Sequence, residues 1–205
     1  MKIGVIDYGA SNIFSVVRAF NSLGASTKVL KKSKDFENID KLVFPGQGSM
    51  GACLKKLSEN DLRDSLIFSL NNLPFLGICL GLQILFSESE ESEDEKGLGI
   101  FPEKIKKFSE FKDRTIKIPH MGWNQVEFSQ SHFIWEGLES SKDFYFVHSY
   151  ASKEIDEKYI YSKTFHGESF NSAVAKDNIF ATQFHPEKSG KSGLNLLQNF
   201  IDWKI

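Results

Sequence analysis

The sequence has few cysteines and no long hydrophobic run. Its 205 residues include only two cysteines, Cys53 and Cys79, and five histidines. These residues do not form a disulfide framework or show metal-ligand spacing, so we expect no disulfide, no metal and a reducing cytoplasm. No apolar stretch approaches the roughly 20 residues of a membrane span, and residues 1–7 lack the pattern of a secretory signal.

The sequence also lacks a strong charge of either sign. Its 25 lysines and arginines and 27 aspartates and glutamates give a formal net charge of -2, and 40% of its residues are hydrophobic. Nucleic acids and acidic membranes attract strongly basic surfaces, so neither is expected as a partner. One stretch is unusual: residues 87–96 (SESEESEDEK) are acidic. We interpret them as a solvated loop or, alternatively, as a mobile flap beside Cys79.

Short apolar runs alternate with helical patterns in the first half of the chain. The strand-like runs are residues 2–7, 27–30, 42–44 and 75–78. Helical periodicity covers residues 13–23, with Ser11 as a cap, and residues 50–57, 62–70 and 80–86, with Asp61 as a cap of the third. Such alternation with short glycine-rich turns predicts a mostly parallel sheet with helices on both faces.

The pattern changes after residue 110, where strands follow one another without long helices between them. The expected strands are residues 116–118, 126–128, 144–148, 159–165, 173–175 and 179–183, before a closing helix over 194–203. No repeat or long linker divides the chain. We therefore predict one α/β domain spanning residues 1–205, with a β-rich, partly antiparallel second half.

Cys79 lies in a pattern typical of a catalytic nucleophile. In the run GICLG (77–81) it stands where an apolar strand turns into a helix, the setting of a nucleophile elbow. Glycines two positions to either side let the strand and helix backbones approach. A helix N-terminus favours a thiolate, and the N–H of Leu80 is placed to donate to an oxyanion. The alternative is a buried structural cysteine, which is how we interpret Cys53.

His185 and Glu187 are candidates for a base and its orienting partner. The run QFHPE (183–187) follows the last apolar strand, so His185 emerges at the sheet edge where Cys79 is also expected. A spacing of two puts both side chains on one side of an extended segment, and Pro186 disfavours helix before it. The pattern alone is also typical of a solvated surface pair, but the elbow cysteine favours a catalytic one.

A glycine-rich turn follows another apolar strand. The run FPGQG (44–48) contains Gly46 and Gly48, whose backbone freedom allows an N–H to turn toward a ligand as a second oxyanion donor. An ordinary turn between a strand and a helix explains this motif equally well.

Together these motifs resemble those of the triad-type (class I) glutamine amidotransferases, which have a flavodoxin-like fold and need no cofactor. The resemblance is carried by the GICLG elbow, the PGQG turn and QFHPEKSG. It is closest to the glutaminase subunits of imidazole glycerol phosphate synthases in histidine biosynthesis, because of VIDYGASN (5–12), HMGWN (120–124) and YFVHSY (145–150).

The resemblance implies roles for particular residues. It implies Cys79 as the nucleophile, His185 as the base and Glu187 as its partner, with the amides of Gly48 and Leu80 at the oxyanion. The positions that it places around bound glutamine are Gln83, His148, Ser149 and Tyr150. The positions that it places against a barrel-shaped synthase subunit, in a heterodimer, and along the ammonia passage are Asn12, Met121, Trp123 and Lys188.

Several alternatives remain open at this point. HMGWN is also typical of a buried Met–Trp cluster in a β-hairpin, and His148 of a hydrogen-bonded histidine at a strand end. Gln47 and Ser11 depart from the family pattern, which more often has an apolar residue and a glycine there. Rival functions are a glutaminase serving another synthase, for example in sugar amidation, a cysteine hydrolase acting on peptides, and a non-catalytic subunit. The HPE run argues against the second, and the complete set of Cys79, His185 and Glu187 against the third.

Overall fold

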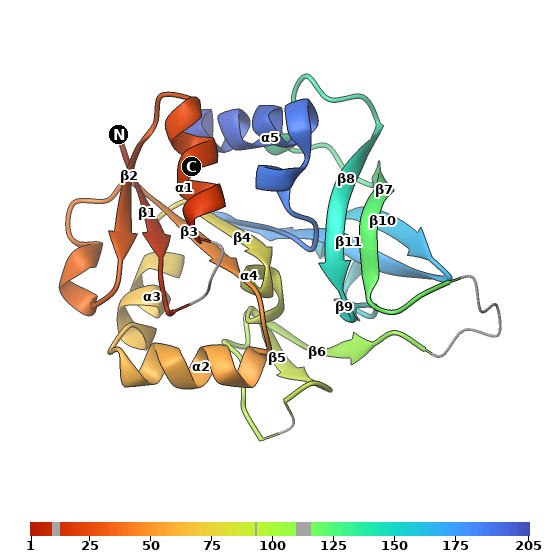
Figure 1. Ribbon diagram of the computed structural model, residues 1–205, viewed down its shortest axis with the longest axis horizontal. Helices are drawn as coiled ribbons and strands as arrows, with labels where there is room; N and C mark the ends of the chain where they lie inside the picture. Colours follow the sequence, from red (N-terminus) through yellow and green to blue (C-terminus); the bar gives the residue numbers. More distant parts are fainter. Residues whose placement is uncertain (10–12, 93, 110–115) are drawn as a thin grey trace.

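The computed structural model describes residues 1–9, 13–92, 94–109 and 116–205 (Figure 1). Its strands form one 12-stranded sheet, parallel in the part built mainly from the first half of the chain and mostly antiparallel in the rest. The predicted fold, a mostly parallel sheet with helices on both faces and a β-rich second half, is confirmed.

The parallel part of the sheet has the strand order β2–β1–β3–β4–β12. Its strands are β1 (Lys2–Ile6), β2 (Ser26–Leu30), β3 (Lys41–Gly46), β4 (Phe75–Cys79) and β12 (Ile179–Thr182). The central strands β3, β4 and β12 are buried along their whole length. Burial on both faces explains why they read as continuous apolar runs in the sequence rather than as alternating ones.

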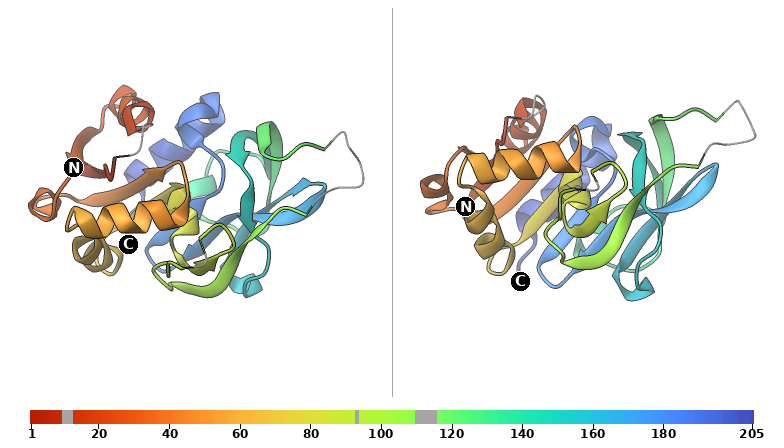
Figure 2. Two further views of the ribbon diagram at one scale, coloured as in Figure 1. Left: turned by 60° about the horizontal axis from the view of Figure 1, so that its bottom comes forward. Right: turned by 90° about the horizontal axis from the view of Figure 1, so that it is seen from below.

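Helices cover both faces of this parallel part (Figures 1 and 2). The two on one face are α1 (Ile13–Ser22) and α5 (Gly190–Asp202), and the two on the other are α2 (Met50–Glu59) and α3 (Arg63–Leu70). Each pair packs into its own cluster of buried apolar side chains. No helix in the described part of the chain is long and apolar enough to cross a membrane. The predicted cap Ser11 lies outside the described residues.

The sheet continues from β12 as an antiparallel series, β11–β10–β7–β8. Its strands are β7 (His120–Phe128), β8 (Ser141–His148), β10 (Ile160–His166) and β11 (Glu168–Lys176). A branch of β5 (Phe86–Ser89), β6 (Phe101–Lys107) and β9 (Tyr150–Ser152) joins β11 through β9. The 3₁₀ turns are η1 (Ser33–Phe36), η2 (Phe133–Trp135), η3 (Glu157–Tyr159) and η4 (Pro186–Lys188).

The predicted helix over residues 80–86 is wrong in its second half. Helix α4 covers only Leu80–Gln83, and Phe86 starts β5, where it pairs with Phe101 of β6. A short apolar run fits a helix and a buried strand equally well, so the tertiary pairing decided the outcome. The stretch 87–96 therefore begins inside a strand, and its interpretation as a loop holds only for the described residues after Ser89.

Three further differences concern a strand that is absent, a helix cap and a strand that was not predicted. Residues 116–118 form no strand, because β7 starts at His120 and pairs with β8 from there. Asp61 does not cap α3: the capping position is Leu62, which makes no side-chain hydrogen bond there, and the Asp61 amide instead donates to Ser58 in the last turn of α2. Strand β6 was not predicted, since the proline and lysines of its sequence (FPEKIKK) are uncommon in strands.

Candidate active site

Cys79 occupies a strained turn between β4 and α4. Its φ is 55° and its ψ is -101°, a conformation that residues with a side chain rarely adopt. The predicted strand-to-helix elbow is thus confirmed in its geometry. The strain is held by parallel neighbours on both sides of β4, and it turns the Cys79 side chain out of the strand toward a cavity.

Backbone crowding explains the two glycines that flank Cys79. A Cβ on Gly77 would lie 2.5 Å from the carbonyl oxygen of Gly81, and a Cβ on Gly81 would overlap the carbonyl oxygen of Phe44 in β3. These obstacles are backbone atoms that cannot rotate away, so only glycine fits at either position. The glycines are therefore required for the elbow to form against the neighbouring strand.

His185 and Glu187 form a buried pair after the end of β12. Nδ1 of His185 lies 2.8 Å from Oε1 of Glu187, and both side chains are 1% exposed. The other ring nitrogen, Nε2, is buried and makes no hydrogen bond among the described residues. The main chain of His185 is fixed in turn, because its N–H donates to the carbonyl of Tyr145 in β8 at 2.8 Å.

The electrostatics of this pair favour a cationic imidazole. Burial alone lowers the pKa of His185, but the negative charge of a Cys79 thiolate and the hydrogen bond and charge of Glu187 outweigh it and raise that pKa above its ordinary value. The three side chains that the sequence singled out are therefore brought together, although they follow the ends of two strands, β4 and β12, that are far apart in the sequence. They can support nucleophilic attack by sulfur assisted by an oriented base.

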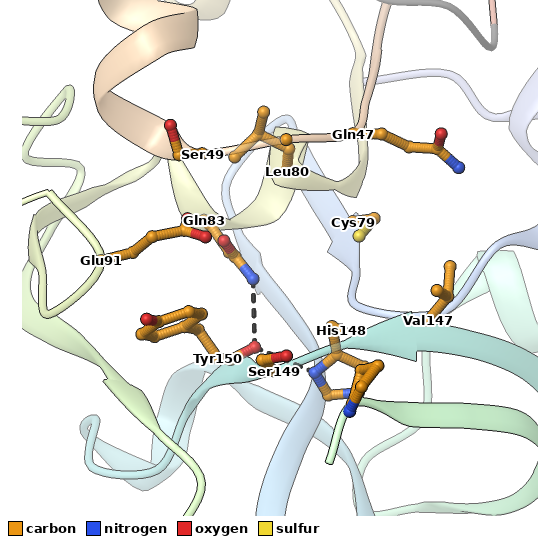
Figure 3. Close-up of a pocket in the computed structure, with 12 residues that line it drawn as sticks. Gln47, Ser49, Cys79, Leu80, Gln83, Glu91, Val147, His148, Ser149 and Tyr150 are labelled. Carbon is orange, nitrogen blue, oxygen red and sulfur yellow. Dashed lines mark hydrogen bonds between the residues drawn. The ribbon is translucent and has the colours of Figure 1, made fainter.

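A cavity of about 370 Å³ opens beside Cys79 (Figure 3). All six residues that the sequence placed at the oxyanion or at bound glutamine line it: Gly48, Leu80, Gln83, His148, Ser149 and Tyr150. His185 and Glu187 do not line this cavity and border a narrower gap beside Gly46 and Gln47. The volume is at the small end of the range for ligand pockets, which suits a small molecule.

Two of these lining residues already donate hydrogen bonds to other groups of the protein. Gln83 donates from Nε2 to the Tyr150 carbonyl at 3.1 Å (Figure 3). The same nitrogen donates to Oε1 of Gln183 at 3.2 Å. His148 uses both ring nitrogens, on His120 and on the Tyr150 carbonyl. Burial lowers the pKa of His148 to about 3, so its ring is neutral at pH 7. These contacts agree with the alternative of a hydrogen-bonded histidine at a strand end.

The glycine turn after β3 forms one wall of the cavity. Gly48 has a φ of 98°, which favours glycine, and it contributes to the cavity lining. The hydroxyl of Tyr8 donates to the carbonyl of Gln47 at 3.3 Å. Burial raises the pKa of Tyr8, which keeps this hydroxyl protonated as a donor. This hydrogen bond anchors the peptide that joins Gln47 to Gly48.

The HMGWN segment presents its large side chains to the surface. Met121 is 63% and Trp123 58% exposed, so the alternative of a buried Met–Trp cluster is wrong. The Trp123 ring contacts the Tyr145 ring at 6.4 Å between centroids, and Nζ of Lys188 lies 5.7 Å from that ring. Three of the four predicted partner residues thus lie in one region next to His185, and Asn12 is outside the described residues.

Sequence reasoning missed three residues of this site. Glu91 lines the cavity, Gln183 donates from Nε2 to the Cys79 sulfur at 3.5 Å, and Tyr8 anchors the glycine turn. Gln183 and Tyr8 stand inside quoted motifs, QFHPE and VIDYGASN, and the acidic run contains Glu91. These runs mark the positions of the three residues, but their contacts depend on distant parts of the chain.

Comparison with known proteins gives a consistent result. The family model described as "Glutamine amidotransferase class-I" matches residues 4–203. The chain is 44% identical to "Imidazole glycerol phosphate synthase subunit HisH" of Nitrosomonas europaea, over 98% of each chain. It is 43% identical to the protein of that name from Methanocaldococcus jannaschii, again over 98% of each.

Solved structures show the same fold at lower identity. A crystal structure of a glutamine amidotransferase is similar with a TM-score of 0.75 and 19% identity, covering 98% of this chain and 97% of that one. A glutamine amidotransferase from Thermotoga maritima is similar with a TM-score of 0.65 and 15% identity, covering 98% of this chain and 83% of that one.

Proposed function

The chain belongs to the class I glutamine amidotransferase family, and from that premise we propose that it is the glutaminase subunit of an imidazole glycerol phosphate synthase. As a single domain of residues 1–205, it hydrolyses glutamine to glutamate and ammonia. The ammonia passes to a barrel-shaped synthase subunit, which makes imidazole glycerol phosphate and aminoimidazole carboxamide ribotide in histidine biosynthesis. The curated relatives that share over 40% identity along the whole chain support this choice over a synthase for sugar amidation.

One observation carries the proposal. A cysteine held at a positive φ opens into a cavity, next to a histidine whose ring is oriented by a buried carboxylate. A structural cysteine needs neither the strained turn nor the oriented base, and a non-catalytic subunit needs no such pair.

The proposed reaction is acyl transfer through a thioester. The Cys79 thiolate attacks the side-chain carbonyl carbon of glutamine, and the amides of Leu80 and Gly48 stabilise the oxyanion. The His185 imidazolium gives its proton to the departing nitrogen, and ammonia leaves. The neutral imidazole then takes a proton from water, whose hydroxide attacks the thioester, and glutamate leaves as the Cys79 thiolate is restored. Glu187 keeps the imidazole ring in place through both steps.

Glu91 is suited to recognise the other end of the substrate. Its carboxyl lines the cavity, and burial raises its pKa despite a hydrogen bond from the Met50 backbone that acts in the opposite direction. The α-ammonium group of glutamine would supply a cation that compensates this half-buried charge. We propose this ion pair as a determinant of binding for a free amino acid, which distinguishes glutamine from a glutamine residue inside a peptide.

The partner subunit is proposed to bind over Met121, Trp123 and Lys188. Met121 and Trp123 are exposed, Lys188 is half-buried, and the region lies next to Tyr145, whose carbonyl accepts from the N–H of His185. Docking there therefore acts close to the catalytic base and to the exit for ammonia. The glycine turn gives docking a second effect. The hydrogen bond from Tyr8 to the Gln47 carbonyl is long, at 3.3 Å, and the glycines on either side allow this peptide to rotate when the partner binds.

We expect the isolated subunit to be nearly silent and to be activated by its partner. If docking completes the oxyanion site, glutamate release rises by on the order of 10²–10³, the usual worth of one oxyanion donor. The measurement is steady-state glutamate release with and without the barrel partner and its nucleotide ligand. Stimulation of less than about tenfold would reject the gating model. The glycine turn after β3 would then be a fixed oxyanion site.

A pair of surface variants locates the activating contact. Trp123→Ala removes an aromatic side chain from the proposed docking region and should weaken the stimulation. Phe68→Ala removes an aromatic side chain that is 70% exposed on α3, and it should leave the stimulation intact. Equal effects of the two substitutions would place the partner elsewhere.

A further inference from the structure

The Cys79 sulfur has a second polar neighbour besides the proposed base. Nε2 of Gln183 lies 3.5 Å from Sγ, and the Gln183 residue is completely buried. The main chain of Gln183 is fixed by its N–H, which donates to the Ser172 carbonyl of β11 at 2.8 Å. Burying a carboxamide costs free energy unless its polar groups make hydrogen bonds, so the partners of the Gln183 side chain determine what it can do beside the nucleophile.

The surrounding hydrogen bonds determine which end of this carboxamide faces sulfur. The Tyr150 carbonyl can only accept, so the group of Gln83 that meets it at 3.1 Å must be its NH₂. The same NH₂ lies 3.2 Å from the other end of Gln183, which must therefore be the oxygen. The NH₂ of Gln183 is left pointing at Cys79. Because the Tyr150 carbonyl can only accept a hydrogen bond, the group of Gln183 that faces the Cys79 sulfur is its NH₂ donor.

The Tyr150 carbonyl is itself held from the opposite side. His148 donates to it from Nδ1 at 2.9 Å, so Nε2 of His148 accepts from Nδ1 of His120 at 3.0 Å. Nε2 of His120 then accepts from the Asn124 amide at 3.1 Å. Each ring carries one proton in this arrangement. That requirement is met because burial lowers the pKa of both histidines to about 3, with the charge of His166, stacked on His120, acting in the same direction.

We propose that Gln183 is a positioning residue that holds the Cys79 sulfur and stabilises its thiolate by donating a hydrogen bond from Nε2. An N–H donor favours the charged form of an acceptor, and a donor to an anion forms a stronger bond than one to a neutral group. His185 supplies charge and proton transfer, whereas Gln183 supplies a neutral donor that stays in place through both halves of the reaction. This inference rests on the proposed role of Cys79 as the nucleophile.

The test is the pH dependence of Cys79 alkylation by iodoacetamide in the full chain. Gln183→Met keeps the length of the side chain and removes the donor. Its alkylation midpoint should move upward by about one to two pH units, the usual worth of a hydrogen bond to a charged group. Gln183→Glu keeps an oxygen for Gln83 and puts a carboxylate near sulfur, so its midpoint should also move upward. Cys79→Ala identifies the alkylated site.

Ser172→Ala is the matched control. It removes a buried hydrogen bond between the hydroxyls of Ser162 and Ser172, 2.9 Å apart, on the strand that anchors Gln183. A merely structural effect would move the midpoint in this variant too, whereas we expect it to stay at the wild-type value. In turnover assays at a pH below the wild-type midpoint, Gln183→Met should lower kcat and leave KM unchanged.

An unchanged midpoint in both folded Gln183 variants would overturn the inference. Alkylation does not involve glutamine, so this result is separate from the proposed function. A wild-type chain that fails to hydrolyse glutamine with its partner would contradict the function, while a shifted midpoint in the same preparation would still support the role of Gln183.

Discussion

Cys79→Ala is expected to abolish glutamine hydrolysis while leaving ammonia-dependent synthesis by the partner subunit intact. Alanine lacks the sulfur that forms the thioester, so no covalent intermediate can arise. Loss of a nucleophile in a comparable hydrolase lowers kcat by on the order of 10⁶, which places the remaining activity below detection in a steady-state assay. The measurements are glutamate release and product formation with glutamine or with an ammonium salt.

The retained ammonia-dependent activity makes this result specific. It shows that the synthase subunit is still active when ammonia is supplied from solution, so the lost step is the release of ammonia from glutamine. Cys53→Ala is the matched control: Cys53 is buried in α2, and burial raises its pKa to about 12, so it is an unreactive thiol. We expect this variant to hydrolyse glutamine at the wild-type rate. Glutamine hydrolysis by Cys79→Ala would contradict the assignment of Cys79 as the nucleophile.

His185→Asn is expected to lower kcat about as severely as loss of Cys79, again by on the order of 10⁶, since the members of a triad act as a unit. Asparagine fills part of the same space but cannot exchange a proton with the leaving nitrogen or with water. It also removes the cation that faces the thiolate. The direct measurement is the rate at which an electrophilic glutamine analogue labels the Cys79 side chain.

Glu187→Gln should be the milder variant of the pair. The amide oxygen can still accept from Nδ1 of His185, so the ring keeps its orientation and loses only the favourable charge. We expect a loss on the order of 10⁴ or smaller, by analogy with the carboxylate of a protease triad. Labelling of Cys79 at the same rate in wild type and in His185→Asn would mean that another residue serves as the base.

The arrangement around Cys79 could be predicted because its residues are required locally. The elbow requires glycine on both sides of Cys79, because the backbone of Gly81 lies against Gly77 and the backbone of Phe44 lies against Gly81. This requirement is visible in the sequence as the short run GICLG. The pair His185 and Glu187 is likewise local, since only Pro186 stands between the residues that form the 2.8 Å hydrogen bond. The alternation of apolar strands and helices similarly predicted the parallel part of the sheet.

The remainder depends on contacts between distant residues. Gln83 and Gln183 are 100 residues apart, so neither side chain reveals in the sequence that it orients the other. Glu91 lies in a stretch whose acidity is typical of a solvated loop, and only the fold brings it to the cavity. Strand β7 was predicted too short because its exposed Met121 and Trp123 obscure the usual alternation, and pairing with β8 determines its start.

The central claim is that glutamine is hydrolysed through a thioester on Cys79. It is tested most directly by acid quenching of the protein with its partner during turnover of glutamine, followed by mass spectrometry of the peptide that contains Cys79. We predict a γ-glutamyl group on the Cys79 sulfur, present during turnover and absent once glutamine is exhausted. Rapid glutamate release with an unmodified Cys79 peptide at every quench time, or with the γ-glutamyl group on another residue, would contradict the account.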